Sequence, residues 1–507
     1  MKRFMFLKSR DRILLSAVIL AGAVLRFFRI ASKSFWCDEF LAISLSRLRF
    51  SDMLGWVIRN DAHPPLFYSI VSFLFRFTQS EAGLRILPAV FGAGAILLFY
   101  LLLRQMRPKD YFLPLCLFAL SPAAVLWSQT VKSYSMLTFF SLLSLLMFFS
   151  FGKTRKIVYA AGWILSALIA VYLHNYGAVI LFAQAVTVFL RRKEFPLKFF
   201  LFPFLVIALG YLPYLAGPVF SQLAFVKGAT HTVTNPFLRT AYAFYYFIFG
   251  ETLSPLNFPL VLPGIVFFAG FLLKGLFSKR DSLQVFSTVV FITAVAMIFS
   301  VKATIPQNLI HLQPFFFAIV AAGIAGISKK WKKVASSILA VLFLIPPLYF
   351  YHAGKTYEYH DAGRLIPHRQ VTRLIQAEER EGEVVIITEQ KDKRFSEFFE
   401  PYSPWDWYYK GGLPVVEVSA ATVTAPVEGL KHLLGEYDGF WLILNYGLAP
   451  HHWNDEVKNF FLEGKSVKME ELKLIKNYSF LDVLRGKGRA EHYLIEVYHI
   501  RKLENGE

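Results

Sequence analysis

Long apolar runs separated by short polar connections occupy the chain from near its start to about Tyr351. An α-helix needs about 20 apolar residues to cross the hydrocarbon core of a membrane. The pattern predicts eleven such helices: Ile13–Ile30, Leu84–Leu103, Tyr111–Trp127, Ser133–Phe151, Ile157–Leu173, Gly177–Leu190, Phe199–Ala216, Phe258–Leu273, Leu283–Ser300, Leu309–Ile327 and Val334–Tyr351. We therefore expect an α-helical, polytopic membrane protein.

Two further apolar runs, Leu66–Phe77 and Phe237–Phe249, are nearer a dozen residues long. This length suits a helix that lies in the membrane interface, and we expect both helices there, the first of them in the first outer loop. With this assignment the basic clusters between the apolar runs all fall on one side of the membrane. The clusters are Lys2 to Arg12, Arg104 to Lys109, Lys153 to Lys156, Arg191 to Lys198, Lys274 to Arg280 and Lys329 to Lys333.

Positive charge collects on the cytoplasmic side of membrane proteins, so the N-terminus is predicted inside and the chain beyond Tyr351 outside. The same distribution explains the net charge of +19 without nucleic acid, and we expect no nucleic-acid partner. The predicted location is the plasma membrane, and the small number of cysteines suits a bacterial or archaeal host.

The composition changes at about His352, where charged residues return among short β-type runs. The predicted strands are Glu383–Thr388, Val415–Ser419, Phe440–Asn445 and Tyr493–Ile500, and the predicted helices are Arg364–Arg380, Val427–Leu434 and Asp455–Glu463. Alternating strands and helices indicate an α/β domain. We therefore predict a membrane domain over residues 1–351 and an extracytoplasmic α/β domain over residues 352–507. Its aromatic cluster, Tyr402, Trp405, Trp407, Tyr408 and Tyr409, could stack on sugars, rest on the membrane or pack into a core.

Polar residues gather at the predicted outer ends of the helices. The first outer loop contributes Asp38 and Glu39, and about two dozen residues later Asp61 and His63 precede a Pro-Pro turn. Other outer connections contribute Glu81, Arg85, Gln129, Lys132, Tyr134, His174, Asn175, Tyr176, Lys302, Gln307, Asn308 and His311. A transporter usually has its polar site near the middle of the membrane. Here the polar residues are confined to one face of the membrane, which fits an enzyme that acts on a membrane-held substrate better than it fits a transporter.

An acidic pair with several cations suits the transfer of a sugar from a lipid phosphate. The phosphate leaves as an anion that cations stabilise, and one carboxylate base can accept the proton of an acceptor hydroxyl. A glycosidase would instead need two opposed carboxyl groups. Two alternatives stay open: a transporter or flippase for a lipid-linked sugar, and a non-catalytic membrane protein that binds glycans.

Several ordered motifs that precede Leu190 carry a family resemblance. They are FWCDEFLA at residues 35–42, HPPLFY at 63–68, LRILPAVFG at 84–92, SPAAVLWSQTVKSYSM at 121–136 and YLHNYGAVILFAQ at 172–184. The chain resembles the GT-C membrane glycosyltransferases, specifically the superfamily of protein O-mannosyltransferases and aminoarabinose transferases that use dolichyl- or polyprenyl-phosphate sugars. The resemblance implies a hexosyl- or pentosyltransferase that serves protein glycosylation or the cell envelope. With one base the sugar would be transferred in a single direct displacement, which inverts its anomeric centre.

The resemblance also implies roles for individual residues. Asp38 would be the base, Glu39 would support the site, and Arg85 would hold the donor phosphate. The residues that would line the donor or acceptor site are His63, Lys132, Tyr134, His174 and Tyr176. Two positions depart from the family: Lys132 stands where many relatives have arginine, and Asn308 with Leu309 stands where relatives often have Arg-Tyr.

Each candidate also has a plain structural explanation. The acidic pair could stabilise a helix N-terminus, Arg85 could reach toward the interface, and Lys132 and Tyr134 could anchor helix ends there. No cofactor is assigned, although Asp38, Glu39, Asp61 and His63 could bind a divalent metal. The sequence leaves the sugar open, and the acceptor could be a protein, a glycolipid or a glycan.

Overall fold

The computed structural model describes residues 9–106, 111–217, 235–253, 258–278, 282–301, 304–353, 367–388, 404–418, 430, 436–445, 451–462, 467–478 and 491–502. The chain forms two compact units. The first unit consists of Met1–Ile30, Leu45–Glu251 and Phe258–Tyr351. The second consists of Ala31–Ser44, Thr252–Asn257 and His352–Glu507, so two short segments that lie far upstream in sequence belong with the C-terminal part of the chain.

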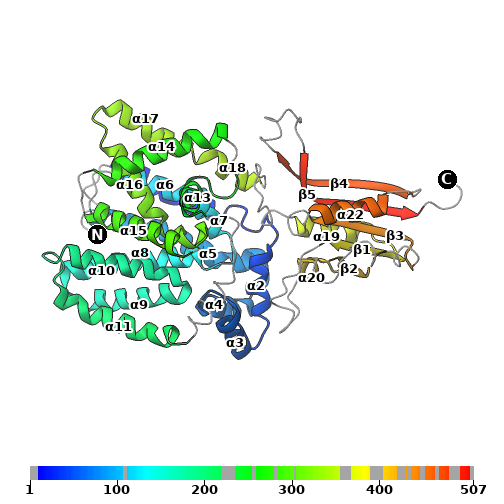
Figure 1. The fold of residues 1–507 in the computed structure, drawn as a ribbon, viewed down its shortest axis with the longest axis horizontal. Helices are drawn as coiled ribbons and strands as arrows, with labels where there is room; N and C mark the ends of the chain where they lie inside the picture. Colours follow the sequence, from blue (N-terminus) through cyan, green and yellow to red (C-terminus); the bar gives the residue numbers. More distant parts are fainter. Residues whose placement is uncertain are drawn as a thin grey trace. The chain divides into compact units, whose positions relative to one another are not determined.

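The first unit is helical (Figure 1). Its helices are α1 (Ser9–Phe27), α3 (Phe50–Asn60), α4 (Leu66–Phe75), α5 (Glu81–Met106), α6 (Phe112–Ala119), α7 (Pro122–Ser128), α8 (Tyr134–Thr154), α9 (Ile157–Leu173), α10 (Ala178–Leu190), α11 (Leu197–Leu215), α13 (Pro236–Phe249), α14 (Phe258–Leu276), α15 (Ser282–Ser300), α16 (Gln313–Ala325), α17 (Lys330–Leu342) and α18 (Ile345–Ala353). Two 3₁₀ helices, η2 (Asn175–Gly177) and η3 (Pro306–Leu312), precede α10 and α16. Helices α8, α9, α10 and α11 pack side by side.

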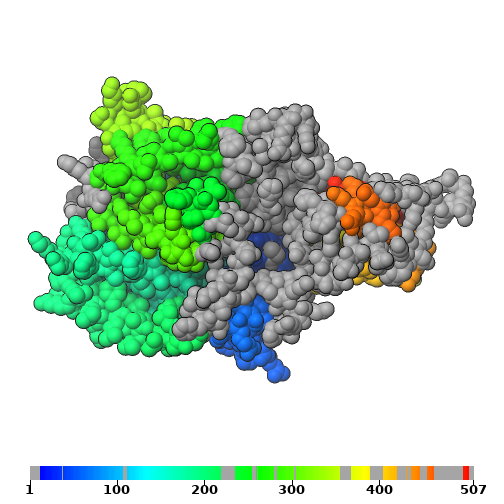
Figure 2. All heavy atoms as spheres, viewed as in Figure 1, coloured from blue at the N-terminus to red at the C-terminus, as the bar shows by residue number. Residues whose placement is uncertain are grey.

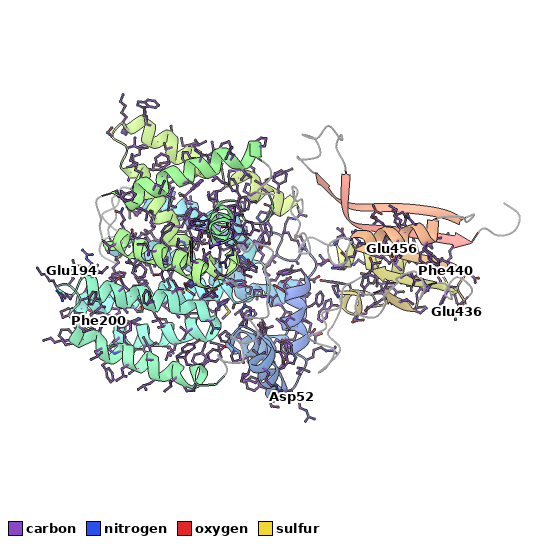
Figure 3. The ribbon with its side chains drawn as sticks, in the orientation of Figure 1. Asp52, Glu194, Phe200, Glu436, Phe440 and Glu456 are labelled. Carbon is purple, nitrogen blue, oxygen red and sulfur yellow. The ribbon has the colours of Figure 1, made fainter. Side chains whose placement is uncertain are left out.

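Aromatic side chains of α8, α9 and α11 pack against one another. The ring of Phe200 lies 5.3 Å from that of Phe148 and 5.8 Å from that of Trp163, centroid to centroid (Figure 3). The outward face of α11 is also apolar, with Phe202 66% and Leu209 56% exposed; Figure 2 shows the surface of these helices in teal and green. An exposed apolar surface of this extent is expected to contact lipid rather than water.

Each of the eleven predicted spans coincides with a helix or a pair of helices. By length and composition, six helical segments of the described chain could cross a membrane: Glu81–Met106, Tyr134–Thr154, Leu197–Leu215, Leu283–Ser300, Pro306–Ala325 and Lys330–Ala353. The others are shorter or less apolar, so the number of crossings stays a prediction. Helices α4 and α13, at 10 and 14 residues, have the short lengths that the sequence predicts for the two interfacial pieces.

One predicted span is interrupted. Instead of one helix over Tyr111–Trp127, the structure has α6 and α7 with a break at Leu120 and Ser121. Pro122 has no N–H to continue the ladder, and the Ser121 hydroxyl caps α7 by accepting a bond from the Ala124 N–H, 3.2 Å. The break leaves carbonyl groups at the end of α6 without helical partners.

Arg26 of α1 satisfies these carbonyl groups. Its guanidinium donates to the carbonyl oxygens of Ala119 at 2.9 Å and Phe118 at 3.4 Å, and to that of Gly22 at 2.7 Å. The side chain is completely buried. This arginine was not predicted to have a role, because it lies inside an apolar run.

The second unit contains a five-stranded mixed sheet (Figure 1). Its strands are β1 (Glu383–Thr388), β2 (Val415–Val418), β3 (Gly439–Asn445), β4 (Val467–Tyr478) and β5 (Glu491–Lys502), in the order β2-β1-β3-β5-β4. Strand β1 pairs in parallel with β2 and β3, with Val385 opposite Val415 and Trp441. Strand β5 pairs antiparallel with β3 and β4.

Helices cover both faces of this sheet. Successive side chains of a strand point to opposite faces, so Val384 and Ile386 pack with Phe440 and with residues of α22 (His451–Leu462). Val385 and Ile387 pack with residues of α19 (His368–Glu378) and α20 (Pro404–Tyr408) on the other face. Figure 3 labels Phe440 among the side chains of the sheet.

The four predicted strands and the helices near residues 368–378 and 451–462 are confirmed, and the domain is α/β as expected. Strand β4 was missed. The predicted helix Val427–Leu434 lies outside the described residues except for Leu430, and so does Tyr402 of the aromatic cluster. That the domain is extracytoplasmic stays a prediction.

Candidate functional site

A polar cluster in the first unit centres on Asp61, the residue that ends α3. The Asp61 carboxylate accepts the backbone N–H of His63 at 3.0 Å and lies 2.7 Å from His63 Nδ1. An aspartate that bonds to a backbone two residues ahead is a common turn former. Together with the following Pro-Pro pair it therefore turns the chain from α3 into α4.

Asp61 is buried, yet its surroundings favour the charged carboxylate. Burial by itself would raise the pKa of Asp61, but the charge and hydrogen bond of His63, the charge of Lys132 and the Tyr68 hydroxyl lower that pKa below its usual range. The Tyr68 hydroxyl donates to the second carboxylate oxygen. A buried anion held by several donors and cations is a fixed electrostatic feature of the site.

His174, between α9 and η2, lies beside both His63 and Tyr134. Its ring lies 4.8 Å from the ring of His63 and 5.7 Å from that of Tyr134. Its Nδ1 accepts the backbone N–H of Tyr176 at 3.2 Å. Burial lowers the pKa of His174 and the neighbouring histidines add to this, so the ring is neutral near pH 7. A neutral ring that accepts at Nδ1 has its proton at Nε2.

Tyr134 joins the cluster to η3, and Tyr176 joins it to the residues just before η3. The Tyr134 hydroxyl donates to Asn308 Oδ1 at 3.3 Å, and the Tyr176 hydroxyl bonds to Thr304 Oγ1 at 2.6 Å. The structure therefore brings together five of the six residues predicted to bind substrate. They are His63, Lys132, Tyr134, His174 and Tyr176. Their roles stay predictions.

Arg85, the sixth, lies near the start of α5 and is buried. Its Nη1 donates to the carbonyl oxygen of Ile30 at 3.1 Å. This bond fixes the arginine against the end of the first helical segment. That Arg85 holds a phosphate stays a prediction.

Arg239 of α13 is a cation that was not predicted from the sequence. It is buried, its Nη1 donates to the Val301 carbonyl oxygen at 2.9 Å, and it lies close enough to Tyr176 to interact electrostatically. In the sequence, Arg239 is marked only as the single arginine of the aromatic, amphipathic run Pro236–Phe249. Lys302, which the sequence also pointed to, lies outside the described residues.

Asp38 and Glu39 belong to the second unit, in the first turn of α2 (Cys37–Leu45). Glu39 is buried, and its Oε2 accepts the backbone N–H of Trp36 at 3.2 Å. This is the glutamate half of a capping box, in which a side chain three residues into a helix satisfies the N–H group before it. Asp38 is only half-buried. Within the described ranges, no group of three or more His, Cys, Asp or Glu side chains could hold a metal ion.

Neither a family model nor a curated protein matches the chain. Among solved structures it is similar to an oligosaccharyltransferase of Archaeoglobus fulgidus, solved with Zn and sulfate, at 14% identity over 85% of this chain and 68% of that one, with a TM-score of 0.47. It is similar to ArnT of Cupriavidus metallidurans at 12% identity over 96% and 97% of the two chains, with a TM-score of 0.48. It is also similar to the arabinofuranosyltransferase AftD of mycobacteria at 12% identity over 98% of this chain and 40% of that one, with a TM-score of 0.46. These neighbours are GT-C glycosyltransferases, the class of membrane enzyme that the motifs preceding Leu190 of this chain resemble.

Proposed function

We propose that this protein is a membrane glycosyltransferase that moves a sugar from a polyprenyl-phosphate donor to an acceptor hydroxyl on the extracytoplasmic face. The observation that carries the proposal is the cluster around Asp61. Residues from four separate connections meet there, and they supply the cation of Lys132, neutral hydrogen-bonding groups and a buried carboxylate.

The reaction would be a single displacement. The acceptor oxygen forms a bond to the anomeric carbon while the bond from that carbon to the phosphate oxygen breaks, which inverts the anomeric centre. The bonding electrons leave with the lipid phosphate, and the acceptor proton passes to Asp38. One base and a set of cations are sufficient for this route.

Three cations are candidates to stabilise the departing phosphate. Lys132 would act as a point charge, whereas the planar guanidinium of Arg85 can bind two phosphate oxygens at once. Arg239, close to Tyr176, is a further candidate because Asn308 stands where relatives often carry a cation. His174, neutral near pH 7, would donate a hydrogen bond without adding charge.

The test is a transfer assay with the purified protein in lipid nanodiscs. Undecaprenyl phosphate carrying mannose, glucose or arabinose is supplied with a membrane extract as the source of acceptors. The proposal predicts release of free undecaprenyl phosphate together with an acceptor whose mass has increased by one sugar. Movement of the intact donor across the bilayer without any such product would instead identify a flippase.

A further inference from the structure

The acidic segment and the α/β sheet belong to the same compact unit although they lie far apart in sequence. Ala31–Ser44, which contains Asp38 and Glu39, is grouped with the C-terminal part of the chain. Among the described residues, two helices that contact the segment are α19 and α20, whose residues Val371, Ile375 and Trp405 pack on one face of the sheet. The segment is therefore attached to helices that pack on the sheet.

Helix α20 contacts the residues on both sides of Asp38. The backbone N–H of Phe35 donates to the Tyr408 hydroxyl at 2.8 Å. The Trp407 ring lies 5.9 Å from the ring of Phe35 and 6.2 Å from that of Phe40, both edge to face. Tyr408 also meets the Phe40 ring edge to face at 6.3 Å. Aromatic pairs in this arrangement stabilise one relative orientation.

Helix α19 contributes a second attachment through Arg369. Its backbone N–H donates to Ser34 Oγ at 3.1 Å. Its guanidinium Nη2 donates to the carbonyl oxygens of Ala31 at 2.7 Å and Ser32 at 3.2 Å. These bonds fix the chain immediately before the acidic pair.

The acidic pair needs such support because α2 has only nine residues. An isolated helix of that length is not stable on its own. The bond from the Trp36 N–H to Glu39 orders the first turn of α2 from within. The contacts at Phe35 and Phe40 then hold that turn against α20.

We propose that α20 and Arg369 position Asp38 for proton abstraction, so that the α/β domain is part of the catalytic apparatus. Trp407, Tyr408 and Arg369 act as positioning residues. This inference depends on the proposed function in one respect, that Asp38 is the base. A misplacement of about 1 Å at a reacting group can lower a rate by roughly 100-fold.

The attachment is tested by hydrogen exchange on the full-length protein in nanodiscs. Tyr408→Phe removes the acceptor of the Phe35 N–H and retains the ring. Tyr409→Phe is the matched control, because it also removes one hydroxyl from this part of the chain. That hydroxyl bonds to Glu379 at 2.7 Å rather than to the acidic segment.

We expect faster exchange in peptides that cover residues 34–40 for Tyr408→Phe and unchanged exchange for Tyr409→Phe. Equal exchange in the two variants would overturn the attachment. This measurement needs no substrate, so its outcome does not depend on the proposed function.

The role in catalysis is tested by steady-state kinetics in the transfer assay, with undecaprenyl-phosphate sugars as the probe. Tyr408→Phe should lower kcat by about five- to tenfold, the loss of one hydrogen bond. Trp407→Ala should lower kcat by roughly 100-fold, and Trp407→Phe should restore most of it. The donor KM should stay close to that of Tyr409→Phe, and the thermal midpoint of Tyr408→Phe should fall no further than that of Tyr409→Phe, which also loses one hydroxyl.

The variant Asp38→Asn shows whether a negative result contradicts the positioning role or the assignment of Asp38 as the base. If Asp38→Asn abolishes transfer while Trp407→Ala retains full kcat, the positioning role is wrong and the base assignment stands. If Asp38→Asn retains full kcat, the base assignment fails, and with it any role in positioning that base. A change in KM or in thermal stability alone would identify Trp407 as an ordinary packing residue and would also overturn the proposal.

Discussion

Asp38 and Glu39 are adjacent in sequence but have different surroundings. Glu39 is 1% exposed and accepts the Trp36 N–H, whereas Asp38 is half-buried. A carboxylate that is committed to capping a helix is a poor candidate for a base. Although they are neighbours in sequence, Glu39 caps the helix and Asp38 is the candidate base.

The capping bond predicts how substitutions at Glu39 should differ. Glu39→Gln retains an oxygen that can accept the Trp36 N–H, so we expect near-normal thermal stability and transfer. Glu39→Ala removes the cap and should cost about 1 kcal/mol in the free energy of unfolding. Thermal unfolding of the two variants checks this, and equal midpoints would show that the bond contributes nothing.

Asp61 should make stability depend on pH. Its pKa is lower in the folded chain than the usual value of about 3.9 expected when unfolded, so it stabilises the fold above that value. This contribution is lost as the pH falls through the folded pKa. The thermal midpoint of Asp61→Asn should lie well below that of the wild type at pH 7, and the gap should shrink below about pH 4.

Asp52→Asn is the control for Asp61→Asn. Asp52 lies on the same helix, α3, but is exposed (Figure 3). Its replacement should change the free energy of unfolding by no more than about 0.5 kcal/mol. A gap for Asp61→Asn that stays constant from pH 7 to pH 3 would contradict the electrostatic explanation.

At the scale of elements, the break between α6 and α7 depends on Arg26. Arg26→Met would leave the Ala119 carbonyl oxygen without this donor, whereas the Phe118 carbonyl oxygen would still accept the Ser121 N–H at 3.3 Å. Each unsatisfied group costs about 1–3 kcal/mol, so we expect a clear fall in the thermal midpoint. Arg59→Met, at an exposed position of α3, should have little effect. Equal midpoints would mean that Arg26 does not stabilise the break.

Elements with a strong apolar pattern could be predicted from the sequence, and the others could not. Strand β1, EVVIIT, is buried on both faces, and its predicted ends are those observed. Strand β4, VKMEELKLIKNY, lies at the edge of the sheet, where charged residues are common and hide the strand pattern. The α6–α7 break was missed because Ser121 and Pro122 interrupt a run that is apolar on both sides.

In the candidate site too, residues with a local sequence pattern could be predicted and residues brought together only by folding could not. His63 was predictable from its place in the predicted first outer loop, and Lys132, Tyr134, His174 and Tyr176 from their places at the outer ends of predicted spans. Arg239 was not, since only the folded chain places α13 beside Tyr176. The attachment of Phe35 to Tyr408 was also hidden, because a contact between such distant parts of the sequence leaves no local pattern.

At the scale of the whole molecule, the charge pattern predicts which side of the membrane each segment faces. After replacement of Cys37 and Cys116, Lys330→Cys and Lys410→Cys place single thiols at two exposed positions. An impermeant maleimide added to intact cells should label the second variant at once and the first only after permeabilisation. The reverse pattern would overturn the predicted topology.

The most direct test of the proposed mechanism is the turnover of Asp38→Asn beside Glu39→Gln in the nanodisc transfer assay. The two variants neutralise adjacent carboxylates of the same turn. Loss of a general base typically lowers the rate by about 100- to 10,000-fold, so we predict a loss of that size for Asp38→Asn and near-normal turnover for Glu39→Gln. Full turnover by Asp38→Asn would contradict the mechanism.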